Sequence, residues 1–173
     1  MVILIAGASH TGKTLLAQRL LEEYHYPYLS MDHLKMGLIR SGNTDLTVFD
    51  DDKLTGYIWP IVREMVKTAI ENGQNLIVEG CYIPFGWRDD FGESYLRHIR
   101  CRWLILSRGY IERHFADIQS HANAIEARLD DTGLNPAELI RENQRNLDGC
   151  KRLGCDYILI DGEYRTELEW AGQ

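Results

Sequence analysis

Eight consecutive residues near the start of the sequence have the types and spacing of a phosphate-binding loop. They are Gly7, Ala8, Ser9, His10, Thr11, Gly12, Lys13 and Thr14, which together match the pattern G-x-x-x-x-G-K-[ST]. Glycines let the backbone curl so that successive N–H groups face an anion, and the N-terminus of a following helix points the positive end of its dipole there. Lys13 would then contact the β- and γ-phosphates of a nucleotide, and the Thr14 hydroxyl would bind Mg²⁺.

The segments on either side of this loop are those that a phosphate site needs. Residues 2–6 (VILIA) are continuously apolar, which is typical of a strand buried in a parallel sheet. Residues 13–24 carry leucines at a helical spacing, which predicts an amphipathic helix. We therefore favour a nucleotide site over a tight turn with an incidental lysine. His10 stands at a variable position of the motif, and we interpret it as a tolerated loop residue rather than a ligand or an acid.

Asp32 comes directly after residues 26–31, which the sequence predicts to be the second strand. Phosphoryl transfer depends on positioning, on charge neutralisation and on one group that orients or deprotonates the attacking hydroxyl. Asp32 is our candidate for that base or for an anchor of the acceptor. A phosphate acceptor needs no base, and Asp32 would then help to hold Mg²⁺ or its waters. The alternative is that Asp32 only caps the following helix.

Glu79 and two cations join Asp32 in this set of polar candidates. Glu79 lies near the end of residues 74–80, a predicted strand, and would accept a hydrogen bond from Mg²⁺-bound water. The alternative is that Glu79 is only an acidic residue at the end of a strand, with no part in binding a metal. Lys35 and Arg40 follow Asp32 on a predicted short helix and would bind an anionic acceptor, although each alone is also compatible with a solvated helix charge.

Four arginines later in the sequence are candidates for stabilising the charge that develops on a transferred phosphoryl group. Such cations are best brought in on a mobile cover, because closure excludes water and completes the site. The four are Arg108, Arg113, Arg141 and Arg145. Arg141 and Arg145 are one helical turn apart, so they share a face of the predicted helix. The alternative is that these arginines serve only the solubility of helices.

Residues 81–91 (CYIPFGWRDDF) form an aromatic segment just after Glu79. If this segment is exposed, Tyr82, Trp87 and Arg88 would contact the acceptor, because aromatic rings can stack on a planar or sugar-ring group. If it folds onto the core, its rings have a structural role. The sequence leaves both interpretations open.

Short β-rich runs alternate with longer helical patterns along the chain. The predicted strands are residues 2–6, 26–31, 74–80, 101–106 and 156–160, and the predicted helices are residues 13–24, 32–42, 53–72, 111–130 and 136–153, with Pro60 at a start or kink. This alternation predicts a doubly wound, three-layer α/β sandwich around a five-stranded parallel sheet. Ligands of such sheets bind beyond the carboxyl ends of the strands.

The overall composition narrows the class of protein. A length of 173 residues suits one domain, residues 1–173, with an ordinary hydrophobic core. A formal net charge of −7 argues against a surface for duplex nucleic acid. The four cysteines lack the paired spacings of zinc sites. The sequence shows no basic leader and no apolar run of about 20 residues, so we expect neither a signal peptide nor a membrane span, and a reducing, cytoplasmic location.

Three stretches together resemble the P-loop kinases of small molecules. They are GASHTGKT (7–14), YLSMDHLKMGLIRSG (28–42) and LIVEG (76–80). The likeness is to the adenylate kinase group, shikimate and gluconate kinases, antibiotic phosphotransferases and zeta-toxin-like kinases. Residues 28–42 are similar to an adenylate kinase stretch with a serine, an acid, a basic residue and a closing Ser-Gly. Adenylate kinase also has a D-G-F-P-R motif after its third strand. At the corresponding place this sequence has only Glu79-Gly80-Cys81.

This resemblance implies a P-loop NTPase fold with a helical lid at about residues 109–135, and ATP and Mg²⁺ as cofactors. Arg113 would belong to the lid, and the pair Arg141 and Arg145 resembles arginines that flank the lid in the family. GTPases are disfavoured because no N-K-x-D string is present. We therefore expect a kinase that moves the γ-phosphoryl group of ATP to a small-molecule acceptor, either a hydroxyl compound or a nucleoside monophosphate.

Two other functions stay open at this point. An ATP-binding regulatory or sensing module would share the phosphate loop but would need no acceptor site. A 5′-hydroxyl nucleic-acid kinase would share the transfer chemistry. The net charge of −7 and the lack of a basic arm argue against long polymers as acceptors.

Overall fold

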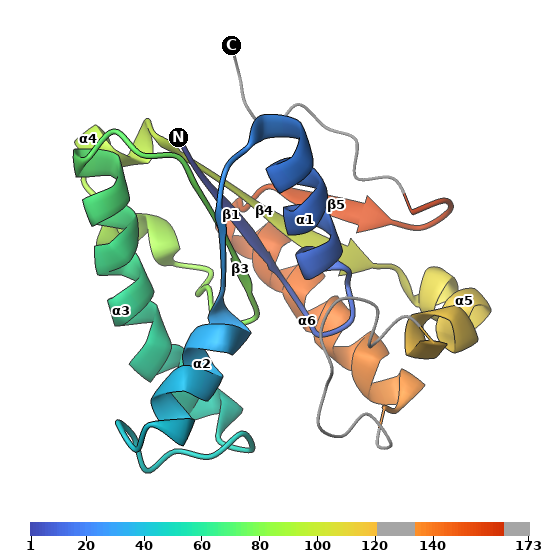
Figure 1. The fold of residues 1–173 in the computed structure, drawn as a ribbon. Coiled ribbons are helices and arrows are strands. Elements are labelled where there is room, and N and C mark those ends of the chain that lie inside the picture. Colours follow the sequence, from blue (N-terminus) through green and yellow to red (C-terminus); the bar gives the residue numbers. More distant parts are fainter. Residues whose placement is uncertain (121–133, 165–173) are drawn as a thin grey trace.

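A sheet of five parallel strands runs through the middle of the molecule (Figure 1). The computed structural model describes residues 1–120 and 134–164. The strands are β1 (Val2–Gly7), β2 (Tyr28–Ser30), β3 (Leu76–Gly80), β4 (Ile99–Leu106) and β5 (Tyr157–Ile160). Their spatial order is β2-β3-β1-β4-β5, and every neighbouring pair is parallel. The predicted five-stranded parallel sheet is confirmed.

The central strand β1 is buried along its whole length, which explains its continuous run of apolar residues. It pairs with β3 on one side and with β4 on the other. In this register Ile5 lies beside Glu79, and on the next strand Ser30 lies beside Glu79 as well. The carboxyl ends of β1, β2 and β3 therefore meet at one edge of the sheet.

Helices cover both faces of the sheet (Figure 1). They are α1 (Lys13–Tyr24), α2 (Met31–Arg40), α3 (Asp51–Glu71), α4 (Glu93–Leu96), α5 (Arg108–Ser120) and α6 (Pro136–Leu153). On one face Leu16 and Leu20 of α1 pack against Ile3 and Ile5. On the other face α3 and α6 pack against the β1 side chains that alternate with Ile3 and Ile5, among them Leu4. The result is the predicted three-layer α/β sandwich.

Helix α6 begins and ends where its sequence signals predict. The Asn135 side chain accepts a hydrogen bond from the Ala137 N–H, and Pro136 occupies the first turn. At the other end Gly154 has the left-handed conformation that commonly terminates a helix, with a φ of 65°. The bounds predicted for α1 and α6 coincide with those observed.

Three of the predicted helices differ from those observed. Helix α2 runs from Met31 to Arg40 where residues 32–42 were predicted, so Met31 belongs to this helix and not to the second strand. Helix α3 begins at Asp51, two residues before the predicted start, and contains Pro60 in its interior. Just before it, hydrogen bonds from the Thr47 backbone and from Lys53 lower the pKa of Asp50 to about 2. Helix α5 begins at Arg108 rather than Ile111 and has a non-helical φ/ψ at His114. The predicted part of this helix from 121 to 130 lies outside the described residues, as does the predicted lid from 121 to 133.

The aromatic segment after β3 folds onto the core. It contains a short 3₁₀ helix, Trp87–Asp90, and α4 follows it; neither was predicted. Phe91 packs edge-on against Trp59 of α3, and the Trp59 Nε1–H donates to Asp90 at 2.7 Å. The Phe85 ring stacks on Trp103 of β4 with centroids 4.3 Å apart. Of the two interpretations of this segment, packing on the core is the one observed.

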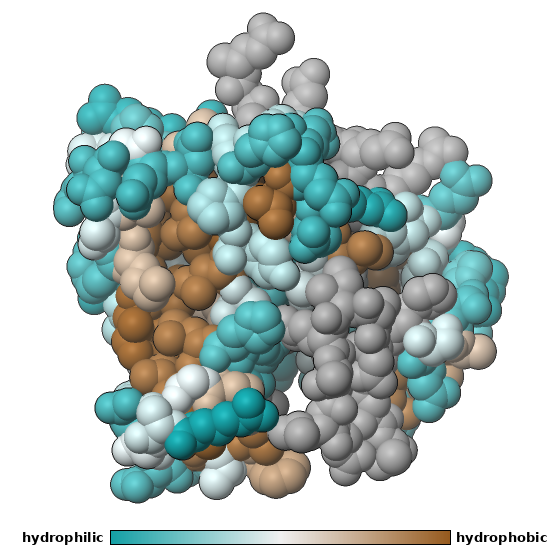
Figure 2. Space-filling view, in the orientation of Figure 1, coloured by the Kyte–Doolittle hydropathy of each residue, from teal (hydrophilic) through white to brown (hydrophobic). Residues whose placement is uncertain are grey.

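The surface shows both apolar and polar regions. Apolar side chains gather on the side of α3, with hydrophilic residues above and below them (Figure 2). Within the described ranges, no helix combines the length and the apolar character needed to cross a bilayer.

The packing of α6 on the sheet depends on a residue without a side chain. A Cβ at Gly149 would lie 2.4 Å from the Phe85 ring, which cannot move without losing its stacking on Trp103. We expect Gly149→Ala to lower the free energy of unfolding in urea by about 1–3 kcal/mol, the usual cost of overpacking. Gly37→Ala is the control, because a Cβ at Gly37 meets nothing within 4 Å and alanine favours a helix. Equal stability of the two variants would contradict this account.

Candidate active site

The phosphate loop has a backbone that requires glycine at both ends of its motif. Gly7 has a φ of 147°, and a Cβ there would lie 2.5 Å from the Leu104 carbonyl oxygen. Gly12 has a φ of 80°, and its Cβ would collide with the Tyr164 hydroxyl. Both φ values lie in the region that side chains disfavour. The loop therefore curls tightly against β4 and against the segment that follows β5.

Hydrogen bonds within the loop hold Lys13 close to it. The Lys13 ammonium donates to the Ala8 carbonyl at 2.7 Å, and the Thr11 hydroxyl donates to the same oxygen at 3.0 Å. Lys13 is buried, and Thr14 is half-buried in the first turn of α1. The cation predicted to contact phosphates is thus already held at the loop rather than in solvent.

Tyr164 also contacts this loop, and this contact was not predicted from the sequence. Its hydroxyl donates to the Thr11 carbonyl at 2.9 Å. Burial raises the pKa of the Tyr164 phenol well above its usual value, so the hydroxyl stays a neutral donor at physiological pH. Tyrosines in a polar segment after a strand are common, and no sequence signal marks this one.

Helix α2 starts directly against the end of β3. A Cβ at Gly80 would lie 2.6 Å from the Met31 Cβ, so only glycine permits this close approach. Asp32 is in the first turn of α2, and the Glu79 carboxylate is at the end of β3 with only 1% of the residue exposed. The two predicted acids therefore lie on neighbouring segments at the carboxyl edge of the sheet.

Asp32, Lys35 and Tyr82 form one polar cluster. The Lys35 ammonium lies 2.6 Å from the Asp32 carboxylate and donates to the Tyr82 hydroxyl at 3.0 Å. The side chains of Lys35 and Asp32 are 15% and 29% exposed, and Tyr82 is 5% exposed. Three of the predicted acceptor residues are thus brought together. We call this group the Asp32 cluster.

The Asp32 cluster and the phosphate loop lie at the same edge of the sheet. Cys81, which directly precedes Tyr82, has its sulfur 3.9 Å from the Ser9 hydroxyl of the loop. Gly80 is beside Ala6, the residue that precedes the loop. A loop suited to phosphates and a cluster suited to an acceptor are therefore neighbours.

The oxygens at this edge fit Mg²⁺. Hydroxyl and carboxylate oxygens are the ligands that Mg²⁺ prefers, often through water and together with nucleotide phosphates. Thr14 in the first turn of α1 supplies a hydroxyl, and Glu79 near the end of β3 supplies a carboxylate. The part of the chain that the structure describes contains no group of three or more His, Cys, Asp and Glu side chains suited to a metal. A metal at this edge would therefore need the oxygens of the nucleotide.

The four predicted arginines and Arg40 belong neither to the Asp32 cluster nor to the contacts of the phosphate loop described above. Arg113 donates to the Asp161 backbone carbonyl after β5, and Arg108 pairs with Glu112 at 2.8 Å. Arg141 is exposed and lies 3.4 Å from Glu138, and Arg145 is exposed on the same helix. Arg40 is exposed about 12 Å along α2 from Asp32 at a rise of about 1.5 Å per residue.

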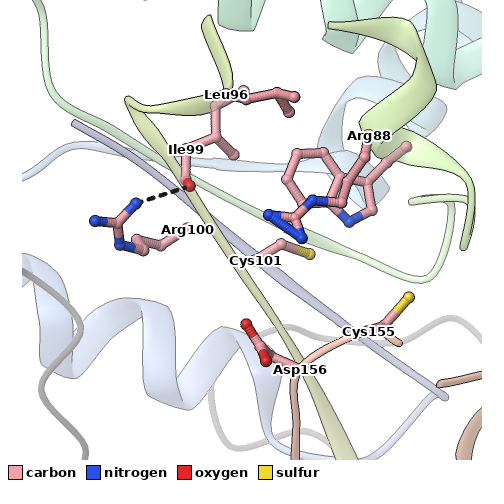
Figure 3. A pocket seen from close by; sticks show the side chains of 8 residues that line it. Arg88, Leu96, Ile99, Arg100, Cys101, Cys155 and Asp156 are labelled. Carbon is pink, nitrogen blue, oxygen red and sulfur yellow. Dashed lines mark hydrogen bonds between the residues drawn. The ribbon is translucent and has the colours of Figure 1, made fainter. Parts of the chain in front are cut away.

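Trp87 and Arg88 lie at the opposite end of the sheet from the phosphate loop. They line a pocket of about 260 Å³ beside the amino ends of β4 and β5, together with Ile99, Arg100 and Asp156 (Figure 3). Trp87 is buried in the core, and the Arg88 guanidinium lies over its ring at 5.3 Å. The structure therefore does not bring these two predicted acceptor residues to the Asp32 cluster.

Asn143 is a second buried polar residue that sequence reasoning missed. Its side-chain oxygen accepts a hydrogen bond from the Leu106 N–H at 2.8 Å, and its amide donates to the Leu139 carbonyl. It thereby fixes α6 to the end of β4. In the sequence it looks like any polar residue of an amphipathic helix.

Comparisons with solved structures agree with this architecture. Shikimate kinase from Bacteroides thetaiotaomicron is 17% identical, with 93% of this chain and 85% of that chain covered and a TM-score of 0.54. Deoxyadenosine kinase from M. mycoides is 14% identical, with 94% and 90% covered and a TM-score of 0.54. No protein-family model matches the sequence, and no curated protein does. Similarity at this level shows that the chain has the α/β fold of P-loop kinases.

The Tyr164 hydroxyl offers a test of the loop geometry. We expect Tyr164→Phe to weaken ATP binding about 2- to 10-fold, because one neutral hydrogen bond is worth about 0.5–1.5 kcal/mol. Calorimetry with ATP measures the change. Tyr57→Phe is the matched control, because the Tyr57 hydroxyl also donates to a backbone carbonyl, that of Asn43 at 2.7 Å, away from the loop. A loss of affinity of the same size in both variants would argue against a specific role of Tyr164.

Proposed function

We propose that this protein is a kinase that transfers the γ-phosphoryl group of ATP, with Mg²⁺, to a hydroxyl group of a small molecule. The observation that carries the proposal is the placement of the phosphate loop and the Asp32 cluster at one edge of the sheet. A kinase needs a phosphate site and an acceptor site side by side, because transfer depends on positioning. The two proteins of similar fold named above are kinases, which supports the same class.

Each residue at this edge has a part in the reaction. The loop N–H groups, Lys13 and Thr14 would hold the phosphates and the metal, and Glu79 would accept from metal-bound water. When bound, Mg²⁺ neutralises charge on the β- and γ-phosphate oxygens. Asp32 takes the proton of the acceptor hydroxyl while the oxygen of that hydroxyl forms a bond to the γ-phosphorus. The bond from that phosphorus to the β–γ bridging oxygen breaks, and ADP leaves.

The arginines are assigned a supporting part in this proposal. Arg113 would approach the transferred group from α5, where it contacts the segment after β5. Arg141 and Arg145 are both exposed on α6 and would approach the transferred group as the site closes. Their contribution is therefore tied to closure of the site around both substrates.

The Asp32 cluster also separates this proposal from its alternatives. A sensing module would need no acceptor site, whereas this edge of the sheet holds a half-buried carboxylate with an ammonium beside it. A nucleoside monophosphate acceptor needs no base, so with that acceptor the loss of Asp32 would change the Mg²⁺ dependence of transfer rather than remove a general base. The net charge of −7 weighs against a nucleic-acid polymer.

Replacement of Asp32 tests the central assignment. A screen of nucleosides, nucleotides, sugars and antibiotics for acceptor-stimulated ADP release identifies the acceptor. We expect Asp32→Asn to lower kcat about 100- to 10,000-fold, the range for loss of a general base, and to leave ATP affinity unchanged. Full activity of Asp32→Asn would remove the base assignment. ATP binding without any stimulation by an acceptor would favour the sensing module.

Replacement of Glu79 tests the metal assignment. We expect Glu79→Gln to raise the Mg²⁺ concentration for half-maximal ADP release about 10- to 100-fold, because outer-shell carboxylates orient metal-bound water. Glu22→Gln, on the exposed side of α1, is the matched control. An unchanged Mg²⁺ dependence in Glu79→Gln would assign this acid a structural role instead.

A further inference from the structure

The position of Lys35 is unusual for a lysine on a short helix. It pairs with Asp32 three residues earlier on α2, but it also bonds to Tyr82, which comes from the segment after β3. Only 15% of the Lys35 side chain is exposed. A solvated helix charge would be neither half-buried nor held by a second element. Lys35 therefore belongs to the site and not to the outer surface of α2.

Tyr82 contacts Lys35 through its hydroxyl and through its ring. The ring is packed in the core, and the Lys35 ammonium lies 5.2 Å from its centroid. Tyr82 follows Gly80 and Cys81 closely, so its place is set by the end of β3 and the contact of Gly80 with Met31. With its ring buried, Tyr82 cannot act as a stacking platform. Its hydroxyl instead fixes where the Lys35 ammonium lies.

An ammonium group has three N–H donors, and the contacts of Lys35 use two of them. The third remains for a ligand that reaches Asp32. A neutral acceptor that displaced the Lys35 ammonium from Asp32 would leave this half-buried ammonium without a negative partner. An uncompensated buried charge is costly. An acceptor with its own negative group would supply the missing partner.

We propose that Lys35, held in place by Tyr82, selects acceptors that carry a negatively charged group beside the reacting hydroxyl. This inference rests on the proposed kinase activity and names the chemical class of its acceptor, a hydroxy acid or a phosphate ester with a free hydroxyl. Lys35 contacts the acceptor in this scheme. Tyr82 is a positioning residue, because it acts through Lys35.

The test compares pairs of compounds that differ mainly in charge. Suitable pairs are glycerate with glycerol, gluconate with glucitol, and a nucleoside 3′-phosphate with its nucleoside. Binding of each is measured by calorimetry on the full chain with a non-hydrolysable ATP analogue present, and phosphoryl transfer is measured with ATP. We expect the acidic member of at least one pair to bind about 10- to 100-fold more tightly, the worth of a hydrogen bond to a charged group.

Lys35→Met keeps an unbranched, largely apolar side chain without the ammonium and should abolish this preference. Lys67→Met is the matched control, because Lys67 also pairs with a carboxylate three residues earlier, that of Glu64 at 3.1 Å, and also lies over an aromatic ring. Lys35→Gln serves as a second variant if Lys35→Met does not fold. Equal binding of acid and neutral compounds by the unmodified protein, or a preference that survives both Lys35 replacements, would overturn the inference.

Tyr82→Phe removes only the hydroxyl and should reduce the preference about 2- to 10-fold, as one neutral hydrogen bond allows. The loss should appear in the KM of the acidic acceptor, with ATP affinity unchanged. Tyr95→Phe, whose hydroxyl bonds to Glu71 at the surface, is the control. A Tyr82→Phe variant that matches Tyr95→Phe would remove the positioning role.

Measuring phosphoryl transfer and acceptor binding side by side distinguishes a failure of this inference from a failure of the kinase proposal. Transfer to neutral and acidic compounds alike would leave the kinase proposal intact and overturn the selection by Lys35. Acid binding that depends on Lys35 without any transfer would overturn the kinase proposal and support the anion site.

Discussion

The position of the carboxyl end of β1 is the constraint on which the rest of the site depends. This strand is buried between β3 and β4, so the loop that follows it emerges in the middle of one sheet edge. Gly7 approaches the Leu104 carbonyl so closely that no side chain fits there. A loop with exposed N–H groups is thereby placed beside the ends of two other strands, where polar side chains can face the same ligand.

Close backbone packing then brings the second half of the site to this edge. The contact between Gly80 and Met31 sets the start of α2 against β3, and both Asp32 and Tyr82 follow within two residues of that contact. Lys35 closes the group because it lies one helical turn beyond Asp32. The Asp32 cluster is thus a consequence of how one helix begins.

Much of this arrangement follows from local patterns in the sequence. The leucine stripe predicted the bounds of α1 and Pro136 predicted the start of α6, and apolar runs located the strands. The path of residues 81–96 did not follow, because its aromatic rings fit an exposed platform and a buried cluster equally well. Trp87 lies far from the loop while Tyr82 lies near it, and only packing distinguishes them. Tyr164 and Asn143 were missed because a buried polar partner is set by tertiary contacts.

The hydrogen bond between Tyr164 and Thr11 joins two points of the chain that are 153 residues apart. We expect such a contact to form late in folding, because the entropy lost in closing a long loop must be offset by the contacts made around it. The phosphate loop precedes β2, β3, β4 and β5 in the chain, yet it would reach its final form only after β5 has joined the sheet. Nucleotide binding would therefore report on the folding of the whole sheet rather than on the loop alone.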